Sequence, residues 1–164
     1  MNAIADWSPV VADCAKQSVT SFGGEAELCG SLSLAQVPSG CSGSYIMLES
    51  SGHVICIGMV AEEQRWHALV APMLGLEPGE PLGDEFTPEE VQDALNEFVN
   101  VLGGMVKRGL NGNLGELTMG LPLYADTPIR VTGMDQKIGY RLVCSGKECH
   151  LVVMYGKRPE ARML

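Results

Sequence analysis

The sequence predicts an α+β fold in which helices pack on one face of a mainly antiparallel sheet of six or seven strands. Two observations carry this prediction. The chain has 164 residues, of which 46% are apolar and 19% charged, so its length and composition suit a single domain, residues 1–164, with one buried core. Helix-like segments are interspersed with short strand-like runs, without the strict strand–helix alternation that is typical of parallel sheets.

The first half of the chain, residues 8–75, begins with a predicted helix. Ser8 is a candidate cap, Pro9 suits the first helical position, and apolar residues recur at helical spacing as far as Phe22. Strand-like runs follow at about 26–36, 44–49 and 53–60, and they predict a small antiparallel meander. A second helix is expected at 61–74, because Gly75 follows its apolar stripe.

Residues 76–86 (LEPGEPLGDEF) predict a surface linker, since they combine acids, prolines and glycines without periodicity. The second half, residues 87–155, opens with a capping box, in which Thr87 is the cap, Pro88 takes the first helical position and Glu90 follows three residues after the cap. A long helix to about Leu110 is therefore expected. Strands are predicted near 116–119, 129–132, 138–144 and 150–155, and a loose tail at 156–164. Both halves thus consist of a helix followed by strands, without a repeat at the level of residues.

Charge and cysteine content exclude several classes of function. The net charge of -9 repels nucleic-acid phosphates and anionic lipid head groups, so neither nucleic acid nor a membrane surface is an expected partner. No apolar run reaches the roughly 18 residues of a spanning helix and the start of the chain shows no export signal, which favours a cytoplasmic protein with reduced, buried thiols. Cys144, Cys149 and His150 flank a predicted hairpin turn at 145–148 and would give three ligands of unsuitable geometry for a metal site, so no metal is expected.

The helix predicted at 87–110 has two different faces. On one side, Asp93, Glu97, Asn100 and Gly104 fall within about 60° of one another when successive residues are placed about 100° apart. We call these four residues the ridge. The opposite arc is apolar and must face the sheet; its members are Val91, Leu95, Phe98, Leu102, Met105 and Val106. On spacing alone, the ridge is also typical of an ordinary solvated helix face whose glycines pack against neighbours.

Glycine in the ridge is the less ordinary feature. Gly104 costs the helix about 1 kcal/mol relative to Ala, and so does the adjacent Gly103. A bare backbone beside Asn100 leaves room for another molecule to approach closely.

The ridge, together with Pro122, resembles a known signature. The residues Asp93, Glu97 and Asn100, followed by Gly104 and by Pro122, resemble the Asp/Ser-xxx-Glu-xx-Asn signature with distal proline of the CheC/CheX/FliY chemotaxis phosphatases. The segment 68–75, which ends in Met-Leu-Gly, is similar to the short helix that this family has before its linker. The likeness covers about residues 44–134.

Two features set the chain apart within this resemblance. The first helix has no Glu-xx-Asn, so the resemblance is to CheX-like members with one site per chain. Asn96 stands where the family usually has Gly before the Glu.

The resemblance implies hydrolysis of the aspartyl phosphate on a CheY-like response regulator. It implies that Asn100 positions the attacking water and that Glu97 binds the conserved lysine of the regulator, with Asp93, Gly104 and Pro122 in the partner-binding surface. No cofactor is expected on this chain, since the Mg²⁺ of the reaction would belong to the regulator. A homodimer joined through sheet edges is also implied. The alternative is a non-catalytic adaptor that uses the acidic ridge only to bind a receiver domain.

Overall fold

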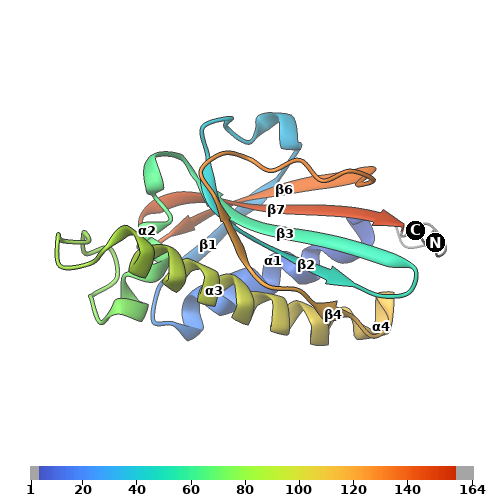
Figure 1. The fold of residues 1–164 in the computed structure, drawn as a ribbon, viewed down its shortest axis with the longest axis horizontal. Helices are drawn as coiled ribbons and strands as arrows, with labels where there is room; N and C mark the ends of the chain where they lie inside the picture. Colours follow the sequence, from blue (N-terminus) through green and yellow to red (C-terminus); the bar gives the residue numbers. More distant parts are fainter. Residues whose placement is uncertain (1–3, 158–164) are drawn as a thin grey trace.

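The computed structural model describes residues 4–157 and has the predicted α+β architecture, a seven-stranded antiparallel sheet with helices on one face (Figure 1). The strand order is β1-β6-β7-β3-β2-β4, and β5 also pairs with β2. The strands are β1 (Ala26–Leu32), β2 (Ser42–Glu49), β3 (His53–Ala61), β4 (Thr118–Met119), β5 (Leu123–Ala125), β6 (Gln136–Cys144) and β7 (Lys147–Lys157).

The two halves of the chain are interleaved within this sheet. Helix α1 (Ile4–Ser21) precedes β1, β2 and β3, and helix α3 (Pro88–Gly109) precedes β4 to β7. The first strand of each half pairs with a hairpin strand of the other half, because β1 pairs with β6 whereas β4 and β5 pair with β2. At the centre, β3 pairs with β7. The sequence only suggests a parallel between the halves. In the structure, the strands of the two halves occupy equivalent positions when the sheet is read from its two edges.

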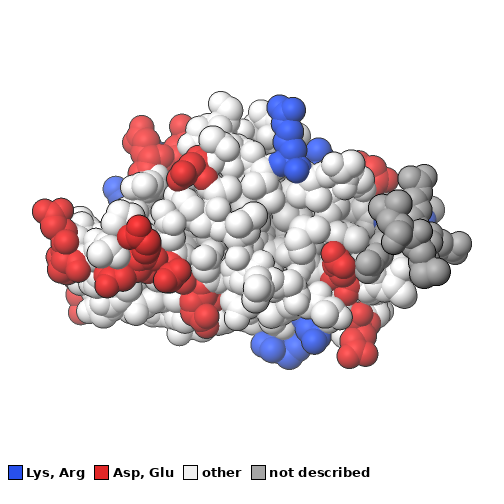
Figure 2. All heavy atoms as spheres, in the orientation of Figure 1, with Lys and Arg blue, Asp and Glu red and all other residues white. Residues whose placement is uncertain are grey.

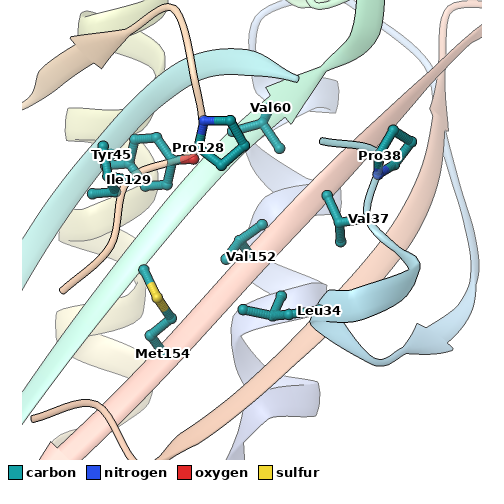
Figure 3. A pocket seen from close by; sticks show the side chains of 9 residues that line it. All are labelled: Leu34, Val37, Pro38, Tyr45, Val60, Pro128, Ile129, Val152 and Met154. Atoms are coloured by element: carbon teal, nitrogen blue, oxygen red, sulfur yellow. The ribbon is translucent and has the colours of Figure 1, made fainter. Parts of the chain in front are cut away.

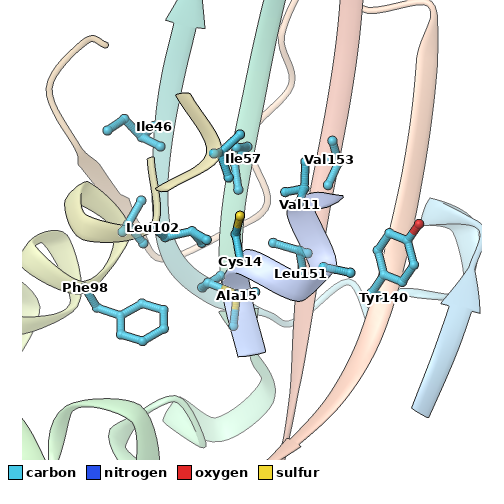
Figure 4. Packing of buried hydrophobic residues seen from close by; sticks show 14 of the residues in the cluster. Val11, Cys14, Ala15, Ile46, Ile57, Phe98, Leu102, Tyr140, Leu151 and Val153 are labelled. Carbon is cyan, nitrogen blue, oxygen red and sulfur yellow. The ribbon is translucent and has the colours of Figure 1, made fainter. Parts of the chain in front are cut away.

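The core lies between the sheet and the two long helices. Figure 4 shows Val11 and Ala15 of α1 and Phe98 and Leu102 of α3 directed toward strand residues such as Ile57. All five are fully buried, and burial of a large aliphatic or aromatic side chain stabilises a fold by about 1.5–3 kcal/mol. The apolar arc predicted for α3 thus faces the sheet, and its opposite face is left to solvent.

The start of α3 is fixed by the capping box that the sequence predicts. The Thr87 hydroxyl oxygen accepts a hydrogen bond from the Glu90 backbone N–H at 3.2 Å, and the Glu90 carboxylate accepts one from the Thr87 N–H at 3.0 Å. Acidic residues in the first turn and Lys107 and Arg108 in the last turn complement the helix dipole. Helix α3 is therefore a rigid support for the side chains on its outer face.

The predicted start of the first helix is wrong. Helix α1 already includes Ile4, so Ser8 is not its cap and Pro9 lies inside the helix. Ile4 and Trp7 are buried, and this burial of apolar surface stabilises an additional helical turn before Pro9. The Ser8 hydroxyl instead lies 2.7 Å from the hydroxyl of Tyr140 on β6.

The prediction of a single helix at 61–74 is also wrong, because the segment consists of several short elements. Strand β3 continues to Ala61, and the rest forms the 3-10 turn η2 (Glu62–Gln64), the short α2 (His67–Val70) and the 3-10 turn η3 (Pro72–Leu74). Glu63 and Gln64 have positive φ angles of 51° and 56°, which no α-helix accommodates. Gly75 ends the segment with a φ of 83°, as expected for a glycine after a helix.

The predictions for the strands and the segments around them need four corrections. The run predicted at 26–36 ends as a strand at Leu32 and continues as the 3-10 turn η1 (Leu34–Gln36). Residues 129–132 form no strand, and the strand of this region, β5, instead lies earlier in the chain. After α3, the short helix α4 (Asn111–Leu114) precedes β4. The predicted tail begins too early, because β7 runs to Lys157, and its remaining residues 158–164 lie outside the described residues.

Loops cover the second face of the sheet. The segment around η1 and the loop after β5 bury a smaller apolar cluster there, which includes Tyr45, Val152 and Met154. A small cavity of about 80 Å³ lies between them. Figure 3 shows the residues that line it, with Ile129 and Leu34 contributed by the two loops. Packing against this cluster explains the apolar residues at 129–132 that suggest a strand in the sequence.

Candidate functional site

The ridge lies on the outer face of α3. Asp93 and Glu97 are exposed, Asn100 and Gly104 are half-exposed, and the four residues follow one another at intervals of four, three and four along the helix. Side chains at these intervals are neighbours on a helix surface. The carboxylate of Glu97 and the carboxamide of Asn100 are therefore presented together to an approaching molecule, one turn apart.

Charge changes sign along α3. Glu89, Glu90, Asp93 and Glu97 make its first half acidic, and basic residues follow only in the last turn. Figure 2 shows acidic side chains gathered along the beginning of the helix and basic side chains near its end. The neutral Asn100 lies between the two regions. A partner that brings a positive charge beside Glu97 and an electrophile beside Asn100 would match this order.

Gly103 and Gly104 have different surroundings. A Cβ atom on Gly103 would lie 3.1 Å from Cδ1 of Ile46 and 3.4 Å from the sulfur of Met119, so Gly103 allows α3 to pack closely on β2 and β4. A Cβ on Gly104 would lie 3.8 Å from the Arg108 guanidinium as its nearest neighbour. Packing within the chain therefore explains Gly103 and leaves Gly104 unexplained.

A hydrogen bond that sequence reasoning missed ties the ridge to the sheet. The hydroxyl of Ser44, which is buried on β2, donates to the side-chain oxygen of Asn96 at 2.7 Å. Asn96 immediately precedes Glu97 and lies one turn before Asn100. The bond therefore fixes the rotation of α3 at the level of the two side chains. The unusual Asn before Glu97 was the available signal, but its partner is 52 residues away in the sequence.

The contribution of the Ser44–Asn96 hydrogen bond to stability can be measured by substituting each residue alone and both together. We expect Ser44→Ala to lower the free energy of unfolding by about 1–2 kcal/mol, since it leaves the half-buried Asn96 oxygen without its donor. Chemical denaturation of Ser44→Ala, Asn96→Ala and the double variant measures this. The double variant should lose little more than either single one, and strictly additive losses would show that the two side chains do not act together.

Pro122 lies on the segment next to α3. The Gly120 N–H donates to the carbonyl of Met47 at 2.8 Å, and Leu123 is the register partner of Tyr45. Pro122 is therefore level with Ile46, the residue that Gly103 packs against. The structure thus brings the distal proline alongside the ridge helix, although 22 residues separate it from Asn100.

The thiol and imidazole groups of the second half are not part of this site. Cys144, Cys149 and His150 are buried at the β6–β7 hairpin. Hydrogen bonding with Cys144 and burial raise the pKa of the Cys149 thiol, and burial lowers the pKa of His150. Within residues 4–157, no three His, Cys, Asp or Glu side chains are grouped so that they could hold a metal ion. All six cysteines are free thiols, and Cys29 is the exposed one.

The fold and the ridge together define a recognisable class of structure. It is an antiparallel sheet shared by two helix–strand halves, with one long helix that presents polar side chains outward. No family model and no curated protein sequence matches the chain. Within residues 4–157, no helix is both long enough and apolar enough to span a bilayer.

Solved structures with the same fold include chemotaxis proteins. CheX from Vibrio vulnificus matches 92% of this chain over 99% of its own length, with a TM-score of 0.71 and 15% identity. A CheC-like superfamily protein from Shewanella sp. PV-4 matches 94% over 99%, with a TM-score of 0.67 and 18% identity. A chain of the CheX–CheY–BeF3–Mg²⁺ complex from Borrelia burgdorferi matches 94% over 99%, with a TM-score of 0.64 and 14% identity. The chain therefore has the CheC/CheX-like fold.

Proposed function

We propose that this protein is a phosphatase that hydrolyses the aspartyl phosphate of a CheY-like receiver domain. The observation that carries the proposal is the pair formed by the exposed Glu97 and the half-exposed Asn100, one turn apart on the outer face of a capped helix of the CheC/CheX-like fold. A fold alone supports many functions, so the residues of the ridge carry the argument. The similar CheX chain solved with CheY, BeF3 and Mg²⁺ supports the choice of partner.

The role assigned to Asn100 is to position the attacking water. In the reaction, a water oxygen attacks phosphorus, the bond between phosphorus and the aspartyl oxygen breaks, and the products are the aspartate carboxylate and inorganic phosphate. Phosphoryl transfer requires in-line positioning and charge stabilisation more than covalent help. The Asn100 carboxamide cannot act as a base near neutral pH, but it offers both a donor and an acceptor that can hold one water opposite the leaving oxygen.

The role assigned to Glu97 is to bind the lysine of the receiver domain. Receiver domains carry a lysine and a bound Mg²⁺ beside the phosphorylated aspartate, and these groups would neutralise charge on the phosphoryl oxygens. The exposed carboxylate of Glu97 can pair with that lysine, and Asp93 extends the acidic surface by one more turn. An ion pair one turn from Asn100 would fix the register of the helix over the phosphate.

Phosphate release and binding, measured together, test the proposal. Receiver domains of the same genome are phosphorylated with a small-molecule phosphodonor in Mg²⁺, and their dephosphorylation is followed with and without this protein. We expect faster release with one cognate receiver. Binding to that receiver without faster release would leave the adaptor alternative, and neither binding nor release with any receiver would contradict both.

Gly104 gives a prediction in which stability and binding move in opposite directions. Gly104→Ala should raise the melting temperature by about 2–4 °C, because alanine favours the helix by about 1 kcal/mol and the added Cβ makes only an ordinary contact, 3.8 Å from the Arg108 guanidinium. The same methyl group should weaken receiver binding about fivefold or more, since it stands where the partner approaches. Calorimetry and titration measure the two effects. A more stable variant with unchanged binding would remove Gly104 from the interface.

A further inference from the structure

Two large apolar side chains are exposed on either side of Pro122. Leu121 is 90% exposed and Leu123 is 60% exposed, and within residues 4–157 these are the exposed large hydrophobic side chains. Leu121 lies in the segment that joins β4 to β5, and Leu123 is the first residue of β5. Figure 2 shows few charged groups in the middle of the face that this segment crosses in Figure 1. Single exposed apolar residues are ordinary on a protein surface, so the positions of the two leucines carry the argument that follows.

The register shows how the two leucines differ. Leu123 pairs with Tyr45, whose side chain belongs to the apolar cluster on the face without helices. Met119 pairs with Leu48 and packs into the core on the helix side. The chain takes four residue steps from Met119 to Leu123, whereas β2 takes only three from Leu48 to Tyr45. The pairing with β2 is therefore irregular between these points, and Leu121 lies in the irregular part. Leu121 is 90% exposed there, whereas Leu123, the register partner of Tyr45, belongs to the face without helices.

This edge of the sheet is poorly suited to pairing with a second copy of the chain. The strands β4 and β5 have only two and three residues, and Pro122 between them has no N–H to donate. The opposite edge, β1, is a strand of seven residues and contains no proline. A dimer joined through sheet edges would therefore form at β1 and would leave Leu121 uncovered.

We propose that Leu121 is the apolar anchor of the surface that binds the receiver domain, an inference that rests on the proposed function. A specific interface of standard size covers about 800 Å² and roughly 20–30 residues on each partner. Pro122 is level with Ile46 and Gly103, so a domain centred on Asn100 must also cover the neighbouring segment. The receiver would meet Glu97 with a charge and Leu121 with an apolar side chain.

The two contacts should respond differently to salt. Salt screens an exposed ion pair, so the share of binding that depends on Glu97 should fall as ionic strength rises. Burial of apolar surface is not screened, so the share that depends on Leu121 should persist. A Leu121 variant should therefore lose the same factor in affinity at low and high salt.

The test compares Leu121→Ser with the matched control Leu123→Ser. Receiver binding is titrated in Mg²⁺ and beryllofluoride, which mimics the aspartyl phosphate, and KM and kcat are measured with phosphorylated receiver. We expect Leu121→Ser to raise Kd and KM about tenfold with kcat unchanged, and Leu123→Ser to change Kd less than twofold. The oligomeric state of each variant is measured by light scattering.

The outcomes separate this inference from the proposed function. If the unaltered protein binds and dephosphorylates a receiver and Leu121→Ser does so equally well, the anchor role is wrong and the phosphatase stands. If Leu121→Ser dissociates a dimer while Kd stays unchanged, a second copy covers the leucine and the inference is also overturned. If the unaltered protein neither binds nor accelerates any receiver, the proposed function fails first and the anchor role fails with it.

Discussion

Replacing Asn100 by alanine should reduce stimulated dephosphorylation of the receiver by about 100-fold, to nearly the rate at which the receiver loses phosphate alone. A positioned water contributes on this order, which corresponds to about 2.7 kcal/mol of barrier. The variant should fold normally, because Asn100 is half-exposed on the outer face of α3. Its Kd for the receiver should change little, since the charge contact through Glu97 remains. Single-turnover decay of the aspartyl phosphate measures the effect.

A carboxamide elsewhere on the surface is the control for this variant. Gln17 is exposed on α1, the helix that precedes the first half of the sheet as α3 precedes the second. Gln17→Ala should leave dephosphorylation unchanged. If Asn100→Ala keeps full activity, water positioning by this residue is wrong, whatever the binding data show.

Reversing the charge at position 97 should act on binding. Glu97→Lys places an ammonium opposite the lysine of the receiver and removes the partner of that lysine, so we expect Kd and KM to rise about 30-fold or more. Removal of one partner of a desolvated charge pair generally costs at least 2 kcal/mol, which corresponds to this factor. The salt dependence of binding should also become weaker in the variant. Titration at two ionic strengths measures both effects.

The control is a charge reversal far from the ridge. Glu27 is exposed on β1, at the opposite edge of the sheet. Glu27→Lys changes the net charge by the same amount and should leave Kd within about twofold, because exposed charges separated by more than a Debye length are largely screened. Equal weakening by both variants would mean that Glu97 contributes only to the overall field of the protein.

Local signals were sufficient to predict the ridge. The capping box at Thr87 set the start of α3, and the 3.6-residue period then determined which side chains face the sheet and which face solvent. The exposure of Glu97 and the half-exposure of Asn100 follow from that period. The fold class followed from the same kind of reasoning, because turn residues divided the strands and the long helices had one apolar face each.

Features that depend on distant residues could not be predicted in this way. Ser44 and Asn96 meet because α3 crosses β2, and neither residue signals the other in the sequence. The positive φ angles at Glu63 and Gln64 break a segment whose apolar spacing alone predicts one helix. Residues 129–132 resemble a strand because they cover an apolar cluster, which depends on the loops of the second face. The role proposed for Leu121 could be inferred only when its exposure and the register of its neighbours were known together.

The decay of aspartyl phosphate on a cognate receiver, with this protein added in substoichiometric amount, tests the central claim most directly. The account predicts that each molecule clears many receivers, with release of inorganic phosphate at a rate that saturates with receiver concentration. Asn100→Ala at the same concentration should leave the decay at the rate of the receiver alone. A decay rate that the unaltered protein does not change, although it binds the receiver, would contradict the assignment of a phosphatase.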